Sequence, residues 1–161
     1  MTEAEAPTWQ TQALNICAIR DASMATIKAQ LPDQSGNNHL ARVIGVPRLR
    51  LSERDVHITE SAVENLVRQL AAGEVTAKEA ALAFLRRAVI AHELTNCIYE
   101  LLPDRALGRA QELDDYLAKH GKPIGPLHGL PISVKEHISV AGCENTAGFS
   151  HLPEPLSRKG W

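Results

Sequence analysis

Two residues at the end of one apolar run have side chains that could act as a nucleophile and its base. Ser133 and Lys135 are two positions apart in the run Gly125–Glu136. On a strand they would share a face, so the amine could accept the hydroxyl proton in a serine–lysine dyad. The amine must be uncharged to do so, and apolar burial favours that form. Because no oxyanion donors are evident, such a dyad is incomplete, and the plainer interpretation of Lys135 is a surface lysine.

The spacing of the histidines does not predict a metal centre. Four of them lie too far apart and too irregularly for a zinc pattern, and Glu144 beside Cys143 adds no second close ligand. These four are His120, His128, His137 and His151. We expect no metal and no cofactor, and we expect His128 to shape the turn before the apolar run.

The composition is that of a soluble globular domain or of a piece of a larger one. Of the 161 residues, 44% are hydrophobic and 22% are charged. The net charge is -2 at pH 7 and the charges are scattered, so neither nucleic acid nor an anionic membrane is an expected partner. The sequence lacks a secretory signal, an apolar run long enough to span a membrane and a CxxC pair. These features predict a cytoplasmic protein with reduced thiols.

The sequence pattern divides the chain into three regions. Residues 1–58 are expected to form a helical and extended arm, with a helix over Trp9–Leu31 and an extended basic connector over Arg42–Arg54. Residues 59–150 carry regular helix and strand signals. Residues 151–161 form a tail with neither periodicity.

Two capping boxes predict consecutive helices in the middle region. Ser61 with Glu64, and Thr76 with Glu79, match the pattern in which side chains satisfy the first backbone N–H groups of a helix. Gly73 stands where a left-handed residue would end the first of these helices. The short connection between them favours an antiparallel pair.

A strand, a helix and a second strand are predicted next. Asn96–Leu101 has the composition of a strand, a helix runs from Pro103 to Gly121, and Leu130–Val134 returns as a strand. Such a connection is right-handed and its strands are parallel. Because parallel sheets have several strands and are buried on both faces, these two would open an incomplete sheet. Its unpaired edges predict self-association or a complementing chain.

Several stretches of the chain, the last of which ends at Lys135, match the motifs of one known protein family. The most specific is Gly-Pro-Leu-His-Gly-Leu-Pro followed by a strand and Lys135; shorter ones are Ile58–Glu60, Ala72–Thr76, Leu94–Cys97 and Glu112–Asp114. Together they resemble the amidase signature family, and within it the fungal acetamidase-type amidases. The likeness covers only the first part of a typical member. The implied fold class is α/β: N-terminal helical segments, then the first βαβ part of an amidase-signature α/β/α sandwich with an incomplete sheet.

The resemblance implies hydrolysis of the carbon–nitrogen bond of a small amide to carboxylate and ammonia. The family uses a serine, a second serine in a cis peptide and a lysine, and by resemblance Lys135 is that lysine. Both serines belong to a Gly/Ser-rich segment that does not occur before Trp161. Residues 1–161 alone are therefore expected to be inactive, and the acyl-binding residues are expected mostly downstream. The alternative is a non-catalytic binding or regulatory fragment, or a remnant of an amidase.

The residues after the lysine follow the family for a short distance. Glu136 stands where the family most often has aspartate. Gly142, Thr146, Ala147 and Gly148 resemble its loop near the active site, or are ordinary turn residues. His151–Trp161 abandons the family pattern abruptly, which predicts a shifted reading frame, a retained intron or a premature stop.

Overall fold

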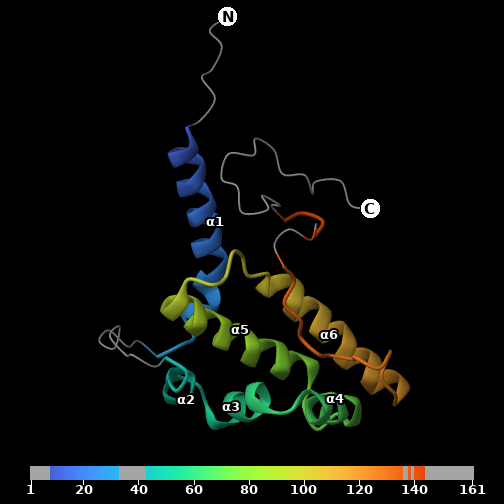
Figure 1. Cartoon of the computed structure of the whole chain (residues 1–161). Helices are drawn as coiled ribbons and strands as arrows, with labels where there is room; N and C mark the ends of the chain where they lie inside the picture. The colour runs from blue at the N-terminus through green and yellow to red at the C-terminus, as the bar shows by residue number, and fades with distance from the viewer. Residues whose placement is uncertain (1–7, 33–42, 136–137, 139, 144–161) are drawn as a thin grey trace, which may run out of the picture. The chain divides into compact units, whose positions relative to one another are not determined.

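The computed structural model describes residues 8–32, 43–135, 138 and 140–143, and six helices lie within them (Figure 1). They are α1 (Trp9–Lys28), α2 (Val46–Arg50), α3 (Glu53–Glu60), α4 (Val63–Ala72), α5 (Ala77–Thr95) and α6 (Pro103–His120). The chain divides into two compact units. One is Ser23–Pro131, and the other takes in the described residues before Ser23 and after Pro131.

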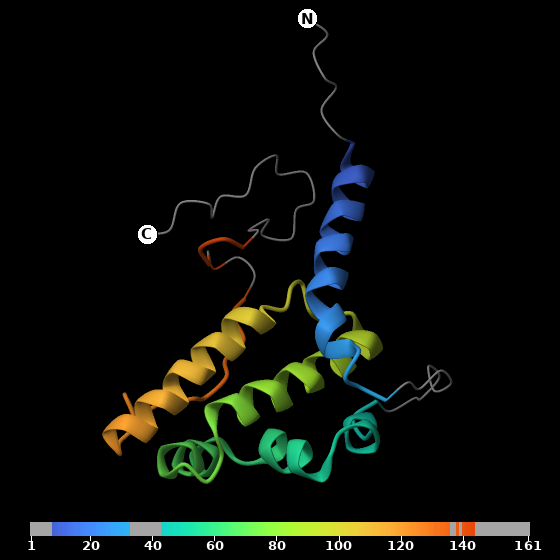
Figure 2. The ribbon, with the colours of Figure 1, turned by 180° about the vertical axis from the view of Figure 1, so that it is seen from behind.

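The core of the Ser23–Pro131 unit is built around α5, which packs against α3 and α6. Figures 1 and 2 show α5 between α6 and the row formed by α2, α3 and α4. Alanines on α5 allow close approach, and larger aliphatic side chains from its neighbours fill the remaining space. One cluster consists of Ile58, Leu66, Leu70, Val75, Ala80 and Ala83, and a second of Met24, Ile27, Leu85 and Val89.

Several helix ends lie where the sequence predicts them. The capping box of α5 is present in both directions. The Thr76 hydroxyl accepts a hydrogen bond from the Glu79 N–H at 3.0 Å, and the Glu79 carboxylate accepts one from the Thr76 N–H at 2.9 Å. Gly73 ends α4 in the left-handed conformation, and α6 begins at Pro103 and ends before Gly121. The helix predicted over Trp9–Leu31 is α1.

A carboxylate from α6 also caps the start of α5. Asp114 Oδ1 accepts a hydrogen bond from the Ala77 N–H at 2.6 Å, and Oδ2 accepts one from the Lys78 N–H at 3.1 Å. These N–H groups belong to the first turn, where no helical carbonyl precedes them, and the helix dipole there favours negative charge. Asp114 therefore fixes the first turn of α5 against α6.

Ion pairs also connect α5 to α1, α2 and α3. Arg50 Nη1 donates to Glu93 Oε2 at 2.5 Å, and Lys28 Nζ lies 3.0 Å from Glu93 Oε1. Partial burial acts to raise the pKa of the Glu93 carboxyl. The hydrogen bonds from Arg50 and Lys28 outweigh that effect and lower the pKa from its ordinary value of 4.5. The buried Asp55 pairs with Arg86 at 3.1 Å and connects α3 to α5.

Two predictions for the N-terminal half of the unit are wrong. Instead of an extended connector, the described part of Arg42–Arg54 contains α2 and the start of α3, because Ser52 caps α3 by accepting from the Asp55 N–H at 3.1 Å. Ser61 is not the cap of α4. It ends α3, its hydroxyl donates to the His57 carbonyl at 2.7 Å, and Ala62 precedes α4 without a side-chain cap.

The predicted βαβ unit is not confirmed, because the described residues contain its helix but no strand. In the first predicted strand, two backbone N–H groups donate to side chains instead of to a neighbouring strand. The Ile98 N–H donates to His92 Nδ1 at 3.2 Å, and the Leu101 N–H donates to Ser23 Oγ at 3.1 Å. A strand exists only through pairing with a neighbour, and no such neighbour is present among the described residues. The tail at 151–161 lies outside those residues.

Asp114→Ala should lower the free energy of unfolding by about 1–3 kcal/mol, because two N–H groups at the start of α5 lose a charged acceptor. Urea unfolding followed by circular dichroism measures the change. Asp115→Ala is the matched control, since Asp115 is exposed on the same helix and accepts a hydrogen bond from Gln111, also of α6. Equal losses in the two variants would contradict the capping role of Asp114.

Glu93→Gln should lower stability at neutral pH, and the difference from wild type should shrink on acidification. A carboxyl whose folded-state pKa is lowered stabilises the fold above its unfolded-state pKa, and this contribution disappears as the pH falls through the folded-state pKa. Unfolding curves collected from pH 7 down to about 3 measure the effect. A difference that stayed constant over that range would show that the charge of Glu93 contributes nothing.

Candidate active-site segment

The Gly- and Pro-rich segment after α6 folds into a set of tight turns around His128. The Ile124 N–H donates to His128 Nδ1 at 3.3 Å, the His128 N–H donates to the Gly125 carbonyl, and the Leu130 N–H donates to the Leu127 carbonyl, both at 3.2 Å. His128 is only 4% exposed. Because Nδ1 accepts a hydrogen bond, the proton of the imidazole is on Nε2, which has no partner among the described residues. The prediction that His128 shapes this turn is confirmed.

Gly129 lies directly against the first turn of α5. A Cβ at this position would be 2.9 Å from Ala77 Cβ and 3.1 Å from Leu70 Cδ2, and the φ of Gly129 is +74°. A side chain would therefore meet both a steric collision and backbone strain. Leu130, the next residue, packs onto the core cluster that contains Leu70. Sequence reasoning noted Gly129 only as part of a motif and missed this contact, since nothing local to Gly129 indicates Ala77.

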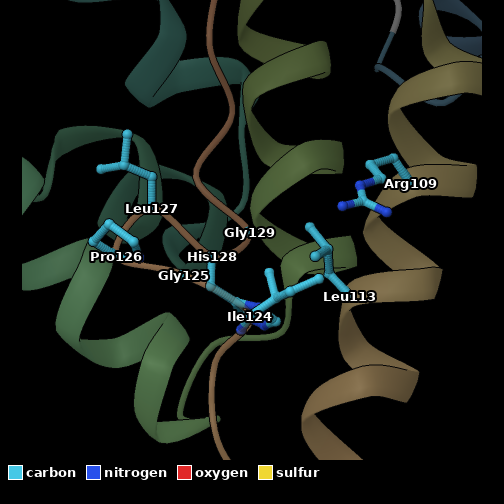
Figure 3. A pocket seen from close by; sticks show the side chains of 8 residues that line it. All are labelled: Arg109, Leu113, Ile124, Gly125, Pro126, Leu127, His128 and Gly129. Atoms are coloured by element: carbon cyan, nitrogen blue, oxygen red, sulfur yellow. The ribbon is translucent and has the colours of Figure 1, made fainter.

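A surface pocket of about 380 Å³ lies between this segment and α6. Figure 3 shows Leu113 of α6 beside Ile124 of the segment, with Arg109 one turn away on α6. Ile124 and Leu127 expose 51% and 62% of their surface. The Arg109 guanidinium donates to Glu112 at 2.8 Å. The lining is thus mostly apolar, with the Arg109 guanidinium and the His128 imidazole, and it contains no serine, cysteine or lysine that could act as a nucleophile.

Beyond Pro131 the side chains face solvent. Ile132 and Val134 are 77% and 47% exposed, and Ser133 and Lys135 are exposed too. This exposure agrees with the plainer interpretation of Lys135 as a surface lysine, because no other described segment covers this apolar run. Ser133 and Lys135 belong to the unit formed by the chain ends, whereas the pocket belongs to the Ser23–Pro131 unit. Neither side chain bonds to a described residue, so the dyad stays a prediction.

The remaining residues singled out by the sequence are only partly described. Gly142 has a φ of +80° in a turn where the Cys143 N–H donates to the Val140 carbonyl at 3.0 Å. Glu136, His137, Glu144, Thr146, Ala147, Gly148 and His151 lie outside the described residues. Within those ranges, no three metal-binding side chains gather and no helix could cross a membrane. None of the three cysteines forms a disulfide.

Comparison with known proteins identifies the class. The family model named Amidase matches residues 79–158. The structure is similar to a fatty acid amide hydrolase with a TM-score of 0.78 and 29% sequence identity, over 88% of this chain and 26% of that one. Over the matched residues the chain is therefore similar to the amidase family, and its fold is similar to that of part of an amide hydrolase.

Two fungal relatives show which kind of amidase the chain resembles. An acetamidase of Emericella nidulans is 54% identical over 99 residues, which are 62% of this chain and 18% of the relative. A putative amidase of Schizosaccharomyces pombe is 39% identical over 150 residues, covering 88% of this chain and 27% of the relative. The resemblance to acetamidase-type amidases is confirmed. The chain spans 18% to 27% of the length of these relatives.

Lys135 in the 161-residue chain should react with an amine-acylating reagent as fast as the lysines at and just after the end of α6, because its side chain is exposed. Limited acetylation followed by peptide mass spectrometry gives the rate at each lysine. Lys119 and Lys122 are the reference residues, since both are exposed. Protection of Lys135 while these two react would contradict the exposed position.

Proposed function

We propose that this chain supplies the N-terminal part of an amide hydrolase that converts a small amide to carboxylate and ammonia, with Lys135 as the base. The observation that carries the proposal is the 54% identity to an acetamidase over 99 residues. Acetamide is accordingly the first substrate to test. The three cysteines form no disulfide, which is consistent with a cytoplasmic location.

The proposed chemistry follows the serine, serine and lysine set of the family. A neutral lysine amine accepts a proton through the bridging serine as the nucleophilic serine attacks the amide carbon. The carbon–nitrogen bond then breaks, the nitrogen takes up a proton and leaves as ammonia, and water hydrolyses the acyl-enzyme to carboxylate. Backbone N–H groups must stabilise the oxyanion. We assign both serines and these donors to polypeptide other than residues 1–161, on the same chain or on a complementing one.

The exposed apolar side chains beside Lys135 agree with an active site in which this chain supplies the lysine and other polypeptide supplies the serines. A solvated lysine is charged at neutral pH and cannot accept a proton. Ile132 and Val134 flank Ser133 next to Lys135 and present apolar surface that a further segment could cover. Covering them would remove water from the amine as well, which favours its neutral form. Residues 1–161 alone should accordingly be inactive and should tend to associate.

A chimera tests the assignment. Residues 1–143 replace the corresponding segment of the Emericella nidulans acetamidase, and ammonia release from acetamide is measured. We expect an active chimera whose kcat falls about a thousandfold or more on Lys135→Ala, as for loss of a member of a catalytic triad. Lys122→Ala, at an exposed lysine, is the control and should leave the rate unchanged.

Three results would contradict parts of the proposal. A folded but inactive chimera would exclude the function, and the chain would then be a non-catalytic fragment. Full activity of the Lys135→Ala chimera would exclude the role of the lysine. Amide turnover by residues 1–161 alone would exclude the need for serines from outside.

A further inference from the structure

We propose that Gly129 is a positioning residue for Lys135, acting through its contact with the first turn of α5. This inference rests on the proposed function and adds to it how residues 129–135, the lysine segment, are held in place. Gly129 precedes Lys135 by few residues, and a Cβ added to it would lie 2.9 Å from Ala77 Cβ of α5. The start of the lysine segment is therefore set by how closely residue 129 approaches Ala77.

The surface that Gly129 contacts is rigid. Ala77 is 2% exposed, and its N–H donates to Asp114 of α6 at 2.6 Å. Thr76, just before it, takes part in the capping box with Glu79. Because the first turn of α5 is held from two sides, moving it away from an added methyl group would strain these hydrogen bonds. We therefore expect a side chain at position 129 to displace the segment itself.

The residues on either side of Gly129 limit how that displacement can be absorbed. His128 is buried and held by the hydrogen bond from the Ile124 N–H, and Leu130 packs onto the core. The chain runs directly from this anchored stretch to Ser133 and Lys135. A shift at residue 129 that His128 and Leu130 do not absorb will therefore pass along the chain toward the lysine.

The test is Gly129→Ala in the chimera that carries residues 1–143. We expect kcat to fall roughly ten- to a hundredfold, since displacements near 1 Å cost catalysis this much. KM should change little, because the acyl-binding residues are expected mostly downstream of this segment. Gly108→Ala, at a glycine with open space around it, is the control and should retain activity. Thermal melting of each variant separates loss of folded protein from loss of rate per folded molecule.

A second-site variant distinguishes positioning from general damage. Ala77 Cβ is the nearest atom to the added methyl group, so Ala77→Gly combined with Gly129→Ala should recover part of the lost kcat. Unchanged kcat in folded Gly129→Ala, or a loss explained entirely by unfolding, would overturn this inference and leave the proposed function intact. An inactive parent chimera would overturn both.

Discussion

The first backbone N–H groups of α5 have no acceptor within their own helix, and the way they are satisfied determines much of the structure. Thr76 and Glu79 supply acceptors from the adjacent chain, and Asp114 supplies a carboxylate from α6. The same hydrogen bonds thus begin one helix and fix its position against another. The surface that results includes Ala77, against which Gly129 lies without a side chain. The position of the Gly- and Pro-rich segment depends on this arrangement.

Sequence reasoning succeeded where an interaction spans only a few residues. The Thr76–Glu79 box, the glycine at the end of α4 and the limits of α6 are local patterns, and each lies where the sequence predicts it. It failed at Ser61, where an equally good box pattern competes with the end of α3. Ser61 could satisfy backbone groups either by capping the start of α4 or by ending α3. Because Ser52 starts α3 just before it, Ser61 falls at the end of α3.

Interactions between distant residues could not be predicted from one sequence. Nothing near Asp114 indicates that it caps a helix that begins 37 residues earlier in the chain. The strand composition of Asn96–Leu101 was recognisable, but a strand also needs a neighbour, and the side chains of Ser23 and His92 accept two of its N–H groups instead. The role of Lys135 follows from family resemblance and stays a prediction, and its side chain is exposed in residues 1–161.

The order of residues along the chain has a consequence for how the protein is made. The contacts that hold Gly129 involve residues from Leu70 to Leu130, and all of them precede Lys135. Domains generally fold from the N-terminus during synthesis, while the ribosome adds about 5–20 residues per second. The Ser23–Pro131 unit can therefore form before the lysine segment and whatever follows it have left the ribosome. On that account, the helical unit is a template for later folding, and errors in its assembly would precede the folding of the residues after Pro131.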